Sequence, residues 1–254
     1  MAPQPDSVIY FGTDEPAPAE RRFSAGALTL VLSDGAIRGL SWHGTEVVRG
    51  IACPVRDANW ATYTSVLADE KVKLSPNEIE ISQSRLVADG ALGVNLTFKG
   101  NSDGTFIATV EMSAYNDFIT KRAGFTLLHP LRDVVGTPLS IIRLNGSVTS
   151  SSFPLLISPE QVAAGITGLR YCVNGIDTEI AFQGEVFEME DQRNWSDASF
   201  KTYCAQRAFR RHRRSGPRHD WPGQGPCRGR HRQECSRYCD CQFHTRRQHP
   251  CARC

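Results

Sequence analysis

The sequence lacks several features that would assign it to a class at once. None of its apolar runs approaches the ~20 residues that a membrane span needs. Residues 1–6 have neither the basic nor the apolar segment of a secretory signal. Residues 1–204 contain three cysteines, Cys53, Cys172 and Cys204, in no disulfide spacing, and no phosphate-binding, dinucleotide-binding or zinc-protease motif. We therefore expect a cytoplasmic protein with reduced thiols, no cofactor and no membrane partner.

The last fifty residues lack the aliphatic side chains on which a packed core depends. Leu, Ile, Val and Met together number 49 in residues 1–204 and none in residues 205–254. In their place stand 13 Arg, six of the nine Cys and five of the seven His. Without aliphatic side chains, nothing offsets the entropy lost when the segment is ordered. We expect residues 1–204 to form the folded domain and residues 205–254 to be a disordered tail.

Charge divides the chain at the same place. Residues 1–204 hold 16 Lys and Arg against 24 Asp and Glu, a net charge of −8, while residues 205–254 carry +10. The overall charge of +2 is the sum of these two values and describes neither part. Because the folded part is acidic, we expect no nucleic-acid partner for it.

Three interpretations of the tail are open. The first is a zinc module, because thiolates in two close pairs suit tetrahedral zinc; its ligands would come from Cys235, Cys239, Cys251, Cys254, His231, His244 and His249, whereas Cys227 and Cys241 fit no pair. The second is a basic arm that binds a polyphosphate through Arg207, Arg210, Arg211, Arg213 and Arg214. The third is out-of-frame translation of a GC-rich gene, which would yield this composition. We favour the third interpretation and predict no metal site.

Residues 1–204 have the pattern of short strands separated by turns. Apolar and polar residues alternate with period two over residues 78–82 and 92–98, and Ser33-Asp34-Gly35 is a hairpin signal. Helical periodicity is sustained nowhere over ten residues. Strands about ten residues apart without intervening helices predict an all-β fold, an antiparallel β-sandwich. The larger supersandwich of mutarotases is one form that this sandwich could take.

A dense polar segment near the end of this domain is the strongest candidate for a binding site. On a strand, Glu188 and Glu190 would share one face, roughly 6–7 Å apart. Carboxylates, Arg, an amide and an indole suit polyols, because the indole covers the apolar face of a sugar ring. We predict that substrate is bound by Glu190, Asp191, Arg193, Asn194, Trp195 and Asp197. The alternative is that Glu188 and Glu190 form a solvated strand face and that Arg193 makes a structural ion pair.

His129, at the end of an apolar strand, is a candidate for acid–base chemistry. With a carboxylate such as Glu188 or Glu190 in reach, it could act on a sugar ring, as in mutarotase-like sandwiches. The alternative is a strand-end histidine bonded to the backbone. His43 lies at an expected hairpin end and reads as a surface residue.

Five segments carry a resemblance to a known family. The segment EDQRNWSDASFKTY at residues 190–203 closely resembles the signature segment of the D-apionate lactonase family. So do FGTDEP (11–16), CPVRDANW (53–60), GFTLLHPL (124–131), and FP with ISP (153–159). The resemblance covers nearly all of residues 9–204. It implies the N-terminal β-sandwich of a cytoplasmic bacterial enzyme of apiose catabolism, which acts on a branched-chain sugar lactone and carries a larger TIM barrel after the sandwich.

The sequence departs from that family after Cys204. TIM-barrel active sites are built on loops at the barrel's C-terminal face, and lactone hydrolysis needs an activated nucleophile and a stabilised oxyanion. The resemblance therefore implies a truncated relative, inactive alone, whose ligand is a sugar or sugar lactone and whose lost intramolecular partner is the barrel. Two alternatives are a non-catalytic carbohydrate-binding module that uses Glu190, Arg193 and Trp195, and a mutarotase-like enzyme that uses His129.

Overall fold

The computed structural model describes residues 5–16, 18–205 and 235–247. Within these ranges the only helix is the six-residue α1 (Asp6–Phe11), and all other regular structure is strand. No helix in the described part of the chain has the length and apolar content needed to cross a membrane.

The strands follow one another along the chain with short connections. Their bounds are β1 (Glu20–Ala25), β2 (Leu28–Ser33), β3 (Ala36–Trp42), β4 (Thr45–Ala52), β5 (Val55–Arg56), β6 (Ser65–Ser75), β7 (Glu78–Val87), β8 (Leu92–Asn101), β9 (Thr105–Ala114), β10 (Arg122–Ala123), β11 (Thr126–Leu128), β12 (Pro138–Arg143), β13 (Val148–Ser152), β14 (Gln161–Val173), β15 (Ile176–Gln183), β16 (Phe187–Asp191), β17 (Phe200–Cys204) and β18 (Cys235–Arg247).

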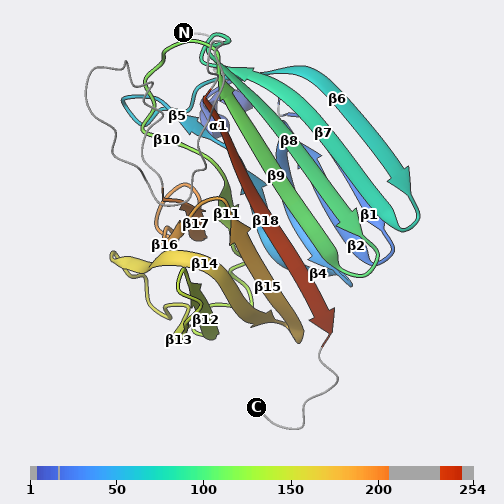
Figure 1. Cartoon of the computed structure of the whole chain (residues 1–254), viewed down its shortest axis with the longest axis vertical. Coiled ribbons are helices and arrows are strands. Elements are labelled where there is room, and N and C mark those ends of the chain that lie inside the picture. The colour runs from blue at the N-terminus through green and yellow to red at the C-terminus, as the bar shows by residue number, and fades with distance from the viewer. Residues whose placement is uncertain (1–4, 17, 206–234, 248–254) are drawn as a thin grey trace, which may run out of the picture.

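The strands form one large folded sheet and one small one. The path through the large sheet is β1-β2-β3-β4-β11-β17-β16-β14-β15-β18-β9-β8-β7-β6, with β12 and β13 joined to β14; β5 pairs with β10. In Figure 1, β6, β7, β8, β9, β18 and β15 run side by side as a front layer, with β1, β2 and β4 behind them. Every pairing is antiparallel, which confirms the predicted all-β antiparallel fold.

The core lies between the layers and is built by alternation along the strands. On β8, Leu92, Val94, Leu96 and Phe98 are buried, as the period-two pattern predicts. The predicted hairpin signal also forms a turn, because Ser33 pairs with Ala36 across Asp34 (φ 41°) and Gly35 (φ 75°). Positive φ at both central residues is the geometry of the two-residue hairpin.

Part of the tail departs from the prediction that residues 205–254 are disordered. Strand β18 lies between β15 and β9 and pairs with both. Its buried residues include Cys241 and Phe243, whereas His244 between Phe243 and Thr245 is exposed. A count of aliphatic residues overlooks Cys and Phe, and the two neighbouring strands supply backbone partners for any extended segment. The structure thus describes residues 235–247 as a strand, while residues 206–234 and 248–254, with the arginine arm and Cys251 and Cys254, lie outside the described residues.

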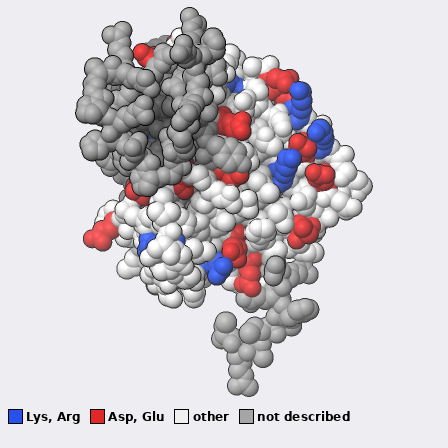
Figure 2. Space-filling view, in the orientation of Figure 1, with Lys and Arg blue, Asp and Glu red and all other residues white. Residues whose placement is uncertain are grey.

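The face seen in Figure 1 carries charges of both signs. Figure 2 shows acidic and basic side chains next to one another over the region of β6 to β9. Lys73 and Lys99 lie 3.3 and 3.5 Å from the carboxylate of Glu80 on the neighbouring strand β7. Among the described residues of this face, charges are therefore paired rather than gathered by sign.

Candidate functional site

The predicted binding residues lie on β16 and on the turn that joins it to β17. Glu188 and Glu190 share one face of β16, as predicted, and Phe187 and Met189 of the other face are fully buried. Glu188 stands opposite Tyr203 and Glu190 opposite Lys201 on β17. Since directly paired residues of antiparallel strands project to the same side, these four side chains belong to one face of the sheet.

Glu190 is held by two side chains of this face. The hydroxyl of Tyr203 donates a hydrogen bond to Glu190 Oε1, and Gln192 Nε2 donates one to Oε2 over 2.7 Å. Burial, and then the bond to Glu190, raises the pKa of Tyr203 above its ordinary value. The phenol therefore stays protonated at neutral pH and acts as a donor, and the carboxylate of Glu190 is fixed in position.

Arg122 of β10 lies against the aromatic rings of this region. Its guanidinium carbon is 3.8 Å from the ring centroid of Tyr203 and 5.4 Å from that of Trp60. Nε of Arg122 is buried and has no hydrogen-bond partner among the described residues. Such an arginine combines cation–π contacts with a buried N–H donor that no described residue uses.

Trp60 is presented by a tight, well-bonded turn. Asp57 Oδ1 accepts hydrogen bonds from the backbone N–H of Asn59 (2.7 Å) and Ala61 (2.9 Å), and Arg56 donates to Thr62 Oγ1 over 2.6 Å. Trp60 adopts a left-handed backbone with φ 69° and is half exposed. Non-glycine residues at positive φ are uncommon and persist where the surroundings hold them.

We call the group formed by Trp60, Arg122, Glu188, Glu190 and Tyr203 the Arg122 platform. It combines an indole, a guanidinium and two carboxylates, groups suited to the hydroxyls and apolar faces of a sugar. Sequence reasoning singled out the two glutamates and missed the roles of the other three residues. Trp60 and Tyr203 each stand at the end of a segment that resembles the lactonase family. That shared position was the sequence signal that could have placed them in one site.

Asp191 and Arg193 form a buried ion pair that supports a neighbouring loop. Arg193 Nε and Nη2 lie 2.9 and 2.7 Å from the two carboxylate oxygens of Asp191. Arg193 also donates to the carbonyls of Leu155 and Leu156, and Asp191 accepts from the backbone N–H of Ser158. Burial alone would raise the pKa of Asp191, but the bonds to Arg193 and Ser158 together outweigh it and lower this pKa. These contacts match the alternative of a structural ion pair. They also use Nε, Nη1 and Nη2 of Arg193, which was predicted to bind substrate.

The turn between β16 and β17 presents the remaining predicted residues. Asn194 and Trp195 are exposed, Trp195 by 69%. Asp197 accepts a hydrogen bond from Lys201 over 2.6 Å, and Arg49 of β4 donates to the carbonyl of Ala198. The turn is therefore anchored on both sides while its indole remains accessible.

His129 lies on the opposite side of β17 from the glutamates. It is fully buried; Nε2 is 2.7 Å from Thr202 Oγ1 and Nδ1 is 3.3 Å from the hydroxyl of Tyr171. Because that hydroxyl donates to the carbonyl of Val47, Nδ1–H is the donor to Tyr171 and Nε2 accepts from Thr202. Burial lowers the pKa of His129 to about 3. The structure therefore brings His129 together with neither Glu188 nor Glu190.

The antiparallel strand pairing defines the class: an all-β sandwich, which solved structures of other proteins share. A protein from Synechocystis sp. PCC 6803 superimposes with a TM-score of 0.55 at 10% identity, covering 92% of this chain and 97% of its own. An Escherichia coli K12 protein described as an aldose 1-epimerase gives 0.50 at 13% identity, covering 91% and 99%. An α-galactosidase from Geobacillus stearothermophilus gives 0.50 at 9% identity, covering 91% of this chain and 41% of that one. At such low identity these likenesses show the fold alone.

Comparison by sequence identifies the family. The family described as D-apionate lactonase, N-terminal domain, matches residues 8–211, and the chain belongs to it. D-apionate lactonase from Brucella anthropi is 34% identical over 202 residues, which are 78% of this chain and 33% of that protein. The matched region thus spans about one third of the curated relative, and the resemblance drawn from the five sequence segments is confirmed. The match ends seven residues beyond Cys204, the predicted end of the domain.

Proposed function

We propose that this chain is a relative of D-apionate lactonase whose sandwich does not hydrolyse lactones by itself. In this proposal residues 205–254, most of which lie beyond the family match, are translated out of frame. We place the protein in the bacterial cytoplasm, in the breakdown of apiose-derived sugar acids. Support comes from the family match and from the similarity to one third of a D-apionate lactonase. The composition after Cys204 supports the proposed change of frame.

The separation of His129 from the glutamates carries the proposal of inactivity. Hydrolysis of a lactone needs a base near an attacking water and donors near the developing oxyanion. His129 is buried and neutral, in contact with Thr202 and Tyr171, on the far side of the sheet from Glu188 and Glu190. The same separation argues against a mutarotase-like mechanism built on His129 and either of these carboxylates.

The test is a rate measurement on the purified full chain. The lactone of D-apionate is incubated with the protein at pH 7, and acid release is followed against buffer and against heat-unfolded protein. The proposal predicts equal rates in all three samples. A rate that exceeds both controls and is lost in Glu188→Gln or Glu190→Gln would refute it.

A second candidate function is non-catalytic carbohydrate binding, and the Arg122 platform favours it. The buried Nε of Arg122 has no partner among the described residues, and the guanidinium lies over the rings of Trp60 and Tyr203. Calorimetric titration with a panel of neutral sugars should show binding that Arg122→Met weakens by about tenfold or more, as expected for loss of a charge-assisted bond. Arg132→Met, which changes a charge outside the platform, is the matched control. Equal affinity in both variants would exclude the platform as the binding site.

A further inference from the structure

The inward face of β7 changes from apolar to polar along its length. Ile79 and Ile81 are followed on the same face by Gln83, Arg85 and Val87, and all five are buried. Arg85 is 5% exposed. A buried arginine is costly unless it is paired and hydrogen-bonded, so its position calls for a specific cause.

Arg85 is held in one orientation by residues from three other positions in the chain. It donates to Asp34 Oδ1 (2.6 Å), to Ser65 Oγ (2.7 Å) and to Gln83 Oε1 (3.2 Å). Gly35 makes room for it, because a Cβ there would lie 2.8 Å from Nη1 of Arg85. The guanidinium is thus preorganised at the hairpin turn between β2 and β3.

The ion pair with Asp34 is asymmetric. The side chain of Arg85 is 5% exposed, whereas that of Asp34 is 64% exposed. The carboxylate of Asp34 is solvated when it leaves, and an anion that replaces it would keep the buried guanidinium paired. The buried guanidinium, in contrast, stays in place and needs an anionic partner.

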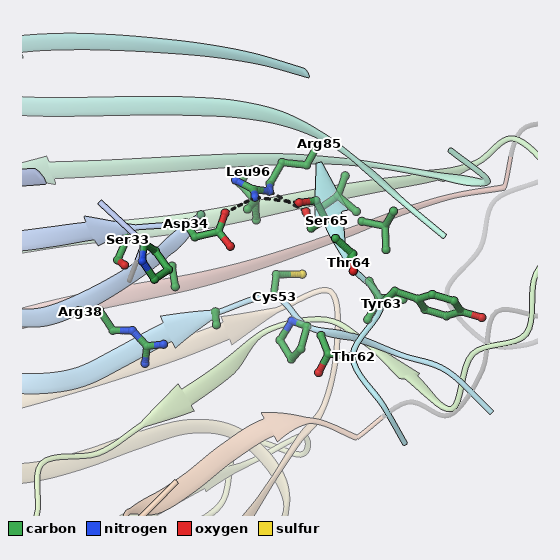
Figure 3. Close-up of a pocket in the computed structure, with 18 residues that line it drawn as sticks. Ser33, Asp34, Arg38, Cys53, Thr62, Tyr63, Thr64, Ser65, Arg85 and Leu96 are labelled. Carbon is green, nitrogen blue, oxygen red and sulfur yellow. Dashed lines mark hydrogen bonds and ion pairs between the residues drawn. The ribbon is translucent and has the colours of Figure 1, made fainter. Parts of the chain in front are cut away.

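Arg85 borders a cavity of about 440 Å³ between the two layers, within the range of small-molecule sites. Figure 3 shows Arg85 joined to Asp34 and Ser65 on one side, with Cys53 and Thr62, from the segments that flank β5, across from them. Val87, Val94 and Leu96 supply apolar wall on β7 and β8. An apolar wall with a few convergent polar groups is the usual composition of a small-molecule site.

The charges of the lining favour an anion. Arg85 and Arg38 contribute two positive charges, and Asp34 is the one acidic residue among the described lining residues. Arg38 of β3 makes no hydrogen bond or ion pair with any described residue, so its guanidinium is available. The hydroxyls of Ser65, Thr62 and Thr64 add groups that can bind other hydroxyls.

We propose that this cavity binds a small hydroxylated carboxylate, of the sugar-acid class. Its carboxylate pairs with Arg85 in the place of Asp34 and is attracted by Arg38, while its hydroxyls meet the Ser65 and Thr62 side of the cavity. The site is distinct from the Arg122 platform. The choice of a sugar acid among small carboxylates rests on the proposed function.

The experiment compares two probes that differ in one group. Sodium gluconate and glucitol have the same six-carbon polyol chain, and only gluconate has a carboxylate. Calorimetric titration of the full chain is expected to show saturable binding of gluconate and at least tenfold weaker binding of glucitol, because the charged group makes the stronger bonds. Equal binding of the two probes, or no binding of gluconate, would overturn the proposal.

Three variants locate the site without relying on a change of the buried arginine. Arg38→Met should weaken gluconate binding about tenfold, and Asp34→Asn should strengthen it, since the competing carboxylate is gone. Arg170→Met, at an ion pair with Glu179 outside the lining of this cavity, is the control and should leave affinity unchanged. If neither Arg38→Met nor Asp34→Asn changes gluconate affinity, the ligand binds elsewhere and the proposed cavity site is refuted.

The result of these binding measurements is distinguishable from the result of the lactone hydrolysis test. Titration with D-apionate and with acetate identifies the class: a preference for D-apionate and gluconate over acetate supports a sugar acid. Equal affinity for acetate reduces the site to a general carboxylate site and overturns the sugar-acid assignment. Lactone hydrolysis is measured in a different assay, and its result leaves these affinities unaffected.

Discussion

Strand β18 makes the sharpest stability prediction, because a sequence without aliphatic residues would not be expected to pack. Phe243 is fully buried, stands opposite Phe106 on β9 and Ile180 on β15, and its ring centroid is 5.7 Å from that of Phe106. Phe243→Ala removes this ring from the middle of the sheet. Truncation of a buried Phe costs about 3–5 kcal/mol.

The expected shift is large enough to measure in two ways. For a chain of this size, 1 kcal/mol changes Tm by about 2–4 °C, so Phe243→Ala should lower Tm by roughly 6–20 °C. Urea denaturation followed by circular dichroism gives the free energy of unfolding directly. His244→Ala, the exposed neighbour on the same strand, is the matched control and should change stability by no more than about 0.5 kcal/mol.

The refuting result is a Phe243→Ala variant as stable as His244→Ala. That outcome would mean that β18 does not pack between β9 and β15, as the prediction of a disordered tail implies for residues 235–247. A loss of about 3 kcal/mol or more would instead make residues 235–247 part of the folding unit.

Two further predictions concern buried polar groups. Since the pKa of His129 is about 3 in the folded protein and about 6.5 when unfolded, only the unfolded state binds this proton between those values. The free energy of unfolding should therefore fall by a few kcal/mol as pH drops from about 6.5 towards 3, and His129→Gln should remove that part of the slope; an unchanged slope in urea titrations would contradict the assignment. Arg193→Met leaves Asp191 buried without its cation and should cost about 3 kcal/mol while exposing residues 155–157 to proteolysis, whereas the same change at the exposed Arg132 should have little effect. Protection of the 155–157 loop unchanged from wild type would show that Arg193 does not hold it.

Local patterns predicted much of the fold. Alternation along β8, the turn at Asp34 and Gly35, and the shared face of Glu188 and Glu190 all depend on residues close in sequence, and the structure contains each of them. Two possibilities were stated for Arg193, and only the folded structure, which places the Leu155 carbonyl beside it, shows the ion-paired loop anchor.

The rest depends on contacts between distant segments. Arg122 meets Trp60 and Tyr203 only because β10 pairs with β5 and β17 lies beside β11. Arg85 follows Ser82, Gln83 and Ser84, a run that reads as polar on both faces, so its burial could not be seen from local alternation. Strand β18 was missed because its order comes from the two strands that flank it rather than from its own composition.

The central claim is that this sandwich binds sugar-like ligands and does not hydrolyse a lactone alone. The most direct test is the initial rate of acid release from the lactone of D-apionate, measured with the purified full chain and with the same sample after heat unfolding. We expect the folded and the heat-unfolded samples to release acid at equal rates. A faster rate with folded protein, saturable in lactone and reduced by Glu190→Gln, would contradict it and place catalysis within this chain.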